Sequence, residues 1–272
     1  MKTLYITDLD GTLLNTSDRI SPYSIQTINR LVEQGMLFSY ATARSLVSAS
    51  AVTKGLSAHI PVIAYNGCLI IHPDTREVAA SLHFSEKEYL DARAQIQANG
   101  IFPIVYSYID GVERLSWMPE HENEGILRYL GNRQGDPRLR PVHSPEELYA
   151  GKIFYFTCIG EKEDLLPVYQ SVHPDSRYTC TLQQELYRPE YWCEIMPGQA
   201  TKANAILKLK ELWGCDRIVS FGDAVNDLPM FRISDECYAV ENAVEELKEA
   251  ATGIIPCNDA DGVAHWLEEH VR

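Results

Sequence analysis

Two aspartates separated by one residue follow an apolar stretch near the start of the chain. Residues 3–7 are apolar or β-branched at nearly every position, which favours a short buried strand, and Asp8, Leu9, Asp10 and Gly11 come next. In extended backbone, residues i and i+2 point to the same side, so the two carboxylates converge. Such a pair repels unless a cation or a shared proton intervenes, and Mg²⁺ is the usual partner of carboxylates in phosphate chemistry. The same residues also fit an ordinary acidic turn, because Asp-Gly is a common turn signal.

A second acidic cluster follows a strand-like segment in the C-terminal part of the chain. The segment 217–221 leads into Gly222, Asp223, Asn226 and Asp227. Asp223 and Asp227 are four residues apart, so a helical turn would put both carboxylates on one face, where they could bind one metal ion. The alternative is that Asp223 or Asn226 caps a helix that begins near Asp227.

Thr42 and Lys202 are polar residues at the ends of other predicted elements. Thr42 closes a strand predicted over 36–41, with Arg44 two residues later, and Lys202 opens a helix predicted over 201–213. A cation at a helix N-terminus opposes the helix dipole, so a nearby phosphate or carboxylate cluster would have to compensate for it. Without such neighbours, Thr42 would be a helix cap and Lys202 a solvated surface residue.

The elements expected around these residues alternate between strand and helix. Strands are predicted over 3–7, 36–41, 61–65, 217–221 and 237–240, and helices over 21–35, 45–54, 201–213, 244–251 and 261–270. This rhythm is typical of an α/β, Rossmann-like core: a parallel sheet with helices on both faces. The carboxyl ends of parallel strands meet at one edge, where such sheets place their ligands, so the polar residues should gather there.

The middle of the chain breaks this rhythm. Asn66-Gly67 and Asp110-Gly111 are hairpin turn signals, and the last strand expected in this part covers 177–187. Hairpins mixed with helices predict an α+β domain with an antiparallel sheet. We expect this domain to be inserted at residues 84–189, with residues 1–83 and 190–272 forming the core.

The motifs resemble those of the haloacid dehalogenase (HAD) phosphohydrolases. The resemblance is carried by Asp-Leu-Asp-Gly-Thr-Leu-Leu at 8–14, Thr-Ala-Arg at 42–44, the segment 194–202 that ends in lysine, and Gly-Asp-Ala-Val-Asn-Asp at 222–227. These segments stand in the family's order, and closing segments near Asn242 and Asp261 extend the likeness to about Ala264. The inserted domain resembles the class IIB cap of the Cof-type members.

The resemblance implies a role for each motif residue. It implies Asp8 as the nucleophile and Asp10 as the general acid and base. It implies that Mg²⁺ is bound by Asp8, Asp10 (through its backbone carbonyl), Asp223 and Asp227. It implies phosphate binding by Thr42, Lys202 and Asn226, and places Arg44 and Asn66 near the substrate. Ala43 stands where many relatives have glycine, which adds a methyl group beside Arg44.

The function implied is Mg²⁺-dependent hydrolysis of a small phosphorylated metabolite, such as a sugar phosphate, through an aspartyl-phosphate, with the cap selecting the leaving group. Two alternatives stay open. A phosphomutase would use the same core and return the phosphoryl group to a sugar, and a non-catalytic regulatory protein would accept phosphate on aspartate. A nucleotide-binding α/β protein is less supported, because the sequence lacks G-x-G-x-x-G and a Walker lysine loop.

Composition limits the partners. The 272 residues carry a formal net charge of −14, which argues against nucleic acid as a ligand. No apolar run approaches the roughly 20 residues needed to span a bilayer, so no membrane association is expected. Asp8, Asp10 and Asp18 make the first residues unlike a signal peptide, and the seven cysteines lack a C-x-x-C pair. We therefore expect a cytoplasmic protein with reduced thiols, acting as a monomer or a weak homodimer.

Overall fold

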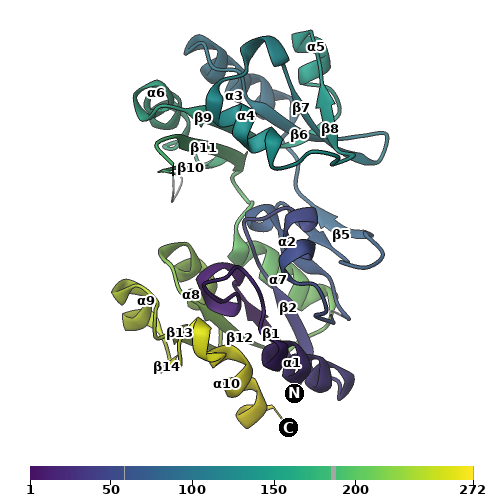
Figure 1. Cartoon of the computed structure of the whole chain (residues 1–272), viewed down its shortest axis with the longest axis vertical. Coiled ribbons are helices and arrows are strands. Elements are labelled where there is room, and N and C mark those ends of the chain that lie inside the picture. The colour runs from purple at the N-terminus through teal and green to yellow at the C-terminus, as the bar shows by residue number, and fades with distance from the viewer. Residues whose placement is uncertain (58, 185–187, 272) are drawn as a thin grey trace. The chain divides into compact units, whose positions relative to one another are not determined.

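The computed structural model describes residues 1–57, 59–184 and 188–271, and the chain divides into two compact units (Figure 1). Unit 1 consists of Met1–Ser81 and Thr201–Arg272, and unit 2 of Leu82–Ala200. Unit 2 therefore ends later than residue 189, where the sequence placed the boundary. The reason is that strand β11 (Tyr191–Pro197) pairs with β10 (Tyr178–Gln184) and β9 (Lys152–Gly160) in the sheet of unit 2.

Unit 1 contains a five-stranded sheet in the order β14-β13-β12-β1-β2. All neighbouring pairs are parallel. The strands are β1 (Thr3–Thr7), β2 (Leu37–Tyr40), β12 (Arg217–Gly222), β13 (Glu236–Val240) and β14 (Gly253–Ile255). Most residues of the central strands β1 and β12 are buried, which explains their nearly continuous apolar sequence. The expected α/β core with a parallel sheet is confirmed.

The α-helices of unit 1 are α1 (Pro22–Glu33), α2 (Leu46–Val52), α7 (Lys202–Leu212), α8 (Leu228–Arg232), α9 (Glu245–Ala250) and α10 (Gly262–His270). Three of them, α1, α8 and α9, connect neighbouring strands of this sheet, and α2, α7 and α10 lie before or after its strands in the chain. Helix α1 packs against α10, whereas α8 contacts α7 and α9, so most of the helices form two groups. The hydroxyl of Ser21 caps α1 and that of Thr201 caps α7, each by accepting from a backbone N–H three residues on. Short helical turns lie at Leu9–Leu13, Tyr65–Gly67, Val225–Asp227 and Asn258–Ala260.

The strand expected over 61–65 belongs to a second, smaller sheet in unit 1. Strands β3 (Val62–Ala64), β4 (Leu69–Ile71) and β5 (Val78–Ser81) form an antiparallel meander. An isolated parallel bridge between Ala41 and Ile63 links this meander to the end of β2. The Asn66-Gly67 turn connects β3 to β4, as its sequence predicts.

Unit 2 is built on a six-stranded sheet in the order β10-β11-β9-β6-β7-β8. Strands β6 (Ile104–Ile109) and β7 (Val112–Trp117) form the expected Asp110-Gly111 hairpin. The sheet is antiparallel except at one edge, where β8 (Leu139–Pro141) runs parallel to β7. The expected inserted domain with an antiparallel sheet is confirmed, and its one parallel pair is possible because the β7–β8 connection contains a helix and is long enough for a parallel crossover. The strand expected over 177–187 is β10, and residues 185–187 lie outside the described residues.

Helices cover the sheet of unit 2 and complete a separate hydrophobic core. They are α3 (Glu86–Ala98), α4 (Glu124–Gly131), α5 (Pro145–Leu148) and α6 (Lys162–Val172), with a short turn at Pro119–His121. Buried side chains of α3 and α6, such as Ile96 and Val168, pack with Phe156 of β9 in one cluster. The seven cysteines, all described, are free thiols, as expected. Within the described ranges, no helix is both long enough and apolar enough to cross a membrane.

Candidate active site

The loop after β1 has a backbone conformation that requires glycine at position 11. Asp8 is buried, and its backbone N–H donates to the carbonyl of Phe221 at 2.9 Å. The chain then forms one wide helical turn over Leu9–Leu13. Gly11 has a φ of +73°, and a Cβ there would lie 2.3 Å from Oδ2 of Asp223. A glycine is therefore required for the loop to approach the second acidic cluster.

The two acidic clusters meet at the carboxyl edge of the parallel sheet. Thr7 and Phe221 are register partners in the adjacent strands β1 and β12, so the loops that follow them are neighbours. Carboxylate oxygens of Asp8, Asp223 and Asp227 all lie within 4.8 Å of one another. The hydroxyl of Thr12 donates to Oδ1 of Asp223 at 2.9 Å and fixes that carboxylate.

Lys202 neutralises part of this negative charge from the start of α7. Its Nζ donates to Oδ1 of Asp8 at 2.6 Å and to Oδ1 of Asp227 at 2.8 Å. The side chain is 4% exposed, so both ion pairs are buried. The cation that opposes the helix dipole thus has the carboxylate partners that its position requires.

Burial and mutual repulsion shift the pKa values of this cluster. Burial raises the pKa of Asp8 to about 7 against the opposing charge of Lys202. Burial also raises the pKa of Asp223 to about 6, with the charge of Asp227 adding to the rise. For Lys202, burial alone would lower the pKa, but the two carboxylates outweigh it and raise the pKa. The site therefore holds more negative charge than its one lysine balances.

Asp227 also fixes the loop that carries Asp223. Its Oδ2 accepts from the backbone N–H groups of Asp223 at 3.1 Å and Ala224 at 3.3 Å. Asp227 is fully buried, whereas the neighbouring Asn226 is exposed. The acidic residue thus serves as a loop brace and as a member of the carboxylate cluster.

Thr42, at the end of β2, and the Asn66-Gly67 turn are joined by hydrogen bonds next to the end of β1 and the start of α7. The buried hydroxyl of Thr42 accepts from the backbone N–H of Arg44 at 3.1 Å, and its carbonyl accepts from the N–H of Asn66 at 3.0 Å. Asn66 has a φ of +52°, in the left-handed region. A Cβ on Gly67 would lie 2.3 Å from the carbonyl oxygen of Thr201, so the turn packs directly against the start of α7.

Asp10 points its carboxylate at Arg44. The Nε of Arg44 donates to both oxygens of Asp10, at 3.1 and 3.0 Å, and its Nη2 donates to Oδ1 at 2.5 Å. This contact with Asp10 raises the pKa of the Arg44 guanidinium. Ala43 is exposed and is not among the residues with positive φ, so its methyl group meets no backbone restriction here.

Some supporting residues were not singled out from the sequence. Thr12 lies inside the first motif, where its hydroxyl could have been noticed. Asn242 lies in a closing segment of the resemblance, and its side-chain amide donates to the carbonyl of Gly11 at 2.8 Å. Asn258 donates its backbone N–H to Oδ1 of Asn242 at 3.0 Å. Both brace the first loop from segments far away in sequence, which local patterns cannot reveal.

The donor set fits a hard divalent cation. Asp8, Asp223 and Asp227 offer carboxylate oxygens, the ligand type that Mg²⁺ prefers. Burial, with the charge of Asp227 adding to it, raises the pKa values of Asp8 and Asp223, and a bound cation would favour their charged forms. The carboxylate of Asp10 contacts Arg44, so Asp10 could offer a cation its backbone carbonyl.

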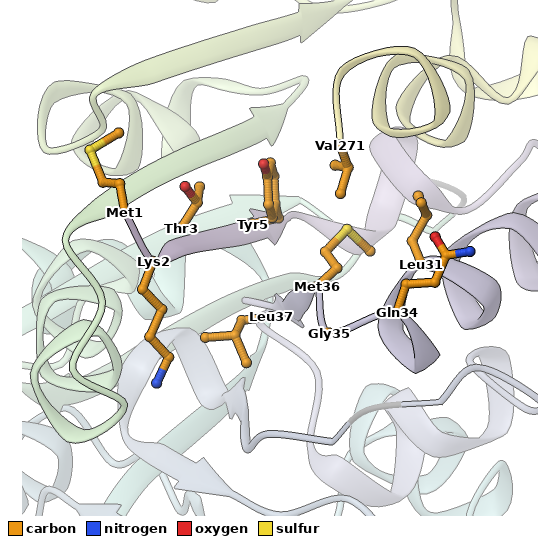
Figure 2. A pocket seen from close by; sticks show the side chains of 10 residues that line it. All are labelled: Met1, Lys2, Thr3, Tyr5, Leu31, Gln34, Gly35, Met36, Leu37 and Val271. Atoms are coloured by element: carbon orange, nitrogen blue, oxygen red, sulfur yellow. The ribbon is translucent and has the colours of Figure 1, made fainter.

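A cavity of about 440 Å³ lies at the other end of the strands (Figure 2). Its lining includes Lys2, Thr3 and Tyr5 at the start of β1, and Gly35 and Leu37 around the start of β2. Because parallel strands begin at this edge and end at the acidic cluster, the cavity is not part of the candidate active site.

The chain is similar to known proteins over almost its whole length. A family model described as haloacid dehalogenase-like hydrolase matches residues 5–267. The chain is 28% identical over 286 residues to 5-amino-6-(5-phospho-D-ribitylamino)uracil phosphatase YwtE of Bacillus subtilis (strain 168), covering 99% of this chain and 98% of that protein. The crystal structure of TM0651 from Thermotoga maritima matches with a TM-score of 0.78 and 27% identity, covering 99% and 97% of the two chains. The HAD subclass IIB sugar phosphatase BT4131 matches with a TM-score of 0.72 and 21% identity, covering 99% and 98%.

Proposed function

The chain belongs to the haloacid dehalogenase-like hydrolases, and from this premise we propose that it hydrolyses a phosphomonoester through an aspartyl-phosphate formed on Asp8. It is a phosphatase of the HAD type that acts on small phosphorylated metabolites. The observation that supports Asp8 is its burial beside Lys202 within a cluster of three carboxylates. A carboxylate that is fixed and paired with a cation can approach a phosphoryl group without prohibitive repulsion.

In the first step, an oxygen of Asp8 forms a bond to phosphorus while the bond from phosphorus to the leaving oxygen breaks. Asp10 gives its proton to that oxygen. In the second step, Asp10 takes a proton from water as the water oxygen attacks phosphorus, and the bond to Asp8 breaks to release phosphate. Lys202 and the hydroxyl of Thr42 would bind the phosphoryl oxygens.

Asp8, Asp223 and Asp227 would hold Mg²⁺, with the backbone carbonyl of Asp10 as a further ligand. When bound, the cation supplies positive charge that offsets the repulsion between the nucleophile and the phosphoryl group. The chain itself contributes the fixed carboxylates: Thr12 orients Asp223, and two backbone N–H groups orient Asp227. Exposed Asn226 would face the phosphoryl oxygens from the same loop.

The substrate we propose carries its phosphate on a polyol or a sugar. The support comes from the names of two similar proteins, a phosphatase of a phosphoribitylamino compound and a sugar phosphatase. The corresponding test is phosphate release from a panel of ribityl, sugar and pyridoxal phosphates, with Mg²⁺ and with EDTA. We expect metal-dependent release, with the polyol or sugar phosphates fastest.

The mechanism is tested with Asp8→Asn, which keeps the shape of the side chain but removes the nucleophile. We expect release to fall by about 10³-fold or more, since the covalent route is lost. Asp164→Asn, an exposed substitution on α6, should leave the rate unchanged. Near wild-type turnover in Asp8→Asn would refute the nucleophile assignment. An isomerised sugar phosphate would identify a mutase, and a stable phosphoprotein without turnover a phospho-acceptor.

A further inference from the structure

The guanidinium of Arg44 lies between two carboxylates, Asp10 and Asp18, that both belong to the segment connecting β1 to α1. Its Nε and Nη2 donate to Asp10, and the same Nη2 donates to Oδ1 of Asp18 at 2.5 Å. The side chain of Arg44 is 22% exposed, whereas those of Asp10 and Asp18 are 51% and 58% exposed. The arginine is thus the most enclosed member of the trio, and both carboxylates reach it from the solvent side.

The backbone of Arg44 is fixed on both sides. Its N–H donates to the hydroxyl of Thr42 at 3.1 Å, and its carbonyl accepts from the N–H of Tyr65 at 3.0 Å. The long side chain still has several rotatable bonds, so fixed backbone alone does not determine where the guanidinium lies. Its position depends on the carboxylates that hold it.

Asp18 reaches Arg44 from an unusual backbone conformation. Its φ is +58°, in the left-handed region that favours glycine and asparagine. A tight turn maintains this conformation: the N–H of Asp18 donates to the carbonyl of Asn15, and the N–H of Asn15 donates to the carbonyl of Arg19, both at 2.9 Å. A hydrogen bond connects the turn to the C-terminal part of unit 1: the backbone N–H of Thr16 donates to Oδ1 of Asp259 at 2.8 Å. Asp18 is therefore presented to Arg44 by a fixed loop.

We propose that Asp18 is a positioning residue, which holds Arg44 where its planar fork can aim the carboxyl group of Asp10. This inference rests on the proposed function, because Asp10 handles the proton of the leaving group. Asp10 is half-exposed and lies two residues after the buried Asp8, so another side chain must hold its carboxyl group in place. A bidentate contact from arginine fixes both the direction and the plane of a carboxylate, which a single hydrogen bond does not.

The substitution Asp18→Asn tests this proposal with little risk to folding. Asparagine keeps the shape of the side chain and is well tolerated at positive φ, but it removes the charge that holds Arg44. The matched control is Asp110→Asn in the β6–β7 hairpin. Asp110 has a φ of +51° and is also exposed, but it belongs to unit 2, whereas Arg44 belongs to unit 1.

The dependence of rate on the leaving group separates positioning of Asp10 from a general structural effect. Two substrates are compared: the alkyl phosphate from the panel that the wild-type protein cleaves fastest, and p-nitrophenyl phosphate, whose leaving group departs with little help from an acid. We expect Asp18→Asn to lower kcat for the alkyl phosphate about 10-fold, part of the roughly 10²–10⁴-fold that general acid catalysis contributes. The kcat for p-nitrophenyl phosphate should change less than about two-fold on the same reasoning.

A double substitution tests whether Asp18 acts through Arg44. We expect Asp18→Asn to have no further effect in an Arg44→Gln background, since the arginine that it would hold is gone. Equal losses of kcat on both substrates, or additive effects of the two substitutions, would overturn the proposal. The turnover of Asp8→Asn is a separate measurement, which tests the proposed function and not the role of Asp18.

A crystal structure of Asp18→Asn provides a readout that does not need turnover. We expect the guanidinium of Arg44 to move and its two-point contact with Asp10 to be lost or shifted. An unchanged contact between Arg44 and Asp10 would overturn the proposal, even if no substrate of the panel were cleaved.

Discussion

Lys202 shows how one residue can determine the charge balance of the acidic cluster. It is buried at the start of α7 and donates to Asp8 and Asp227. Asp223, whose pKa is raised to about 6, accepts a hydrogen bond from Thr12 and is not one of the two carboxylates that Lys202 contacts. A single ammonium group therefore pairs with two of the three nearby carboxylates, and its removal should make the stability of the fold depend on another cation.

We predict that Lys202→Met lowers both activity and stability, and that Mg²⁺ restores stability. Breaking a buried ion pair by removing one partner costs about 3–5 kcal/mol. A cation bound to the folded state would recover part of that loss, because ligand binding favours the state that binds. Thermal unfolding in EDTA and in Mg²⁺ measures the effect: the rise in Tm caused by Mg²⁺ should be larger in the variant than in the wild type.

The control is Lys208→Met on the same helix. Lys208 is 46% exposed and pairs with Glu211 on the surface, so its loss should leave the response to Mg²⁺ unchanged. If Lys202→Met and Lys208→Met responded equally to Mg²⁺, Lys202 would not be balancing the charge of the carboxylate cluster.

At the scale of elements, the turn Tyr65–Gly67 joins two parts of the site. On one side, the backbone N–H of Asn66 donates to the carbonyl of Thr42. On the other side, Gly67 packs against the backbone of Thr201. We predict that Gly67→Ala destabilises the fold by about 3 kcal/mol or more, since left-handed backbone alone costs roughly 1–2 kcal/mol and the new Cβ also meets backbone. Activity should fall as well, because the shift is transmitted to Thr42 and Lys202.

Gly35→Ala is the matched control for that prediction. Gly35 has a φ of +102°, close to the +105° of Gly67, but a Cβ there would meet nothing within 4 Å. We expect it to cost about 1–2 kcal/mol from the backbone alone, without loss of activity. Urea unfolding and phosphate release measure both quantities, and equal losses in the two variants would show that the contact with Thr201 does not matter.

Strand β11, the second strand from one edge of the unit 2 sheet, carries a half-buried acid. Glu194 faces Thr157 of β9 and Thr181 of β10 as register partners. Burial raises its pKa from 4.5 to about 7, partly offset by a hydrogen bond from Tyr155. The folded protein therefore keeps this proton up to about pH 7, while the unfolded chain loses it near pH 4.5. Glu194 thus makes stability fall as pH rises through that window.

We predict that Glu194→Gln removes this part of the pH dependence. Glutamine keeps an acceptor for Tyr155 and carries no charge. At pH 5 the two proteins should be similarly stable, and at pH 8 the variant should be more stable by at most about 3 kcal/mol, at 1.36 kcal/mol per pKa unit. Urea unfolding at the two pH values measures this, with exposed Glu163→Gln as the control. Parallel pH profiles for Glu194→Gln and the wild type would contradict it.

At the scale of the whole molecule, the sequence predicted what depends on local pattern. The β1 and β12 strands read as apolar runs that end in aspartates, and parallel pairing brings Asp8 and Asp223 together. The sequence did not predict the parallel edge strand β8 or the place of β11, because these depend on which strands pair. The contact between Arg44 and Asp18 joins residues 26 positions apart, so it too follows from tertiary structure.

The two units differ in how they can fold. Unit 1 is built from two separate segments, since β1 in the first pairs with β12 in the second. Unit 2 is one continuous segment, Leu82–Ala200, with its own sheet and its own hydrophobic cluster. A continuous segment with a complete core meets the usual conditions for independent folding.

We therefore predict that residues 82–200, produced alone, fold cooperatively. Near-ultraviolet circular dichroism should show fixed aromatic packing, and urea should unfold the fragment in one transition. Phe156→Ala is the internal test of the core, because Phe156 is fully buried and such a truncation costs about 3–5 kcal/mol. A gradual transition that Phe156→Ala leaves unchanged would mean that the cluster is not an independent core. The fold of unit 2 would then depend on unit 1, although the chain enters and leaves it once.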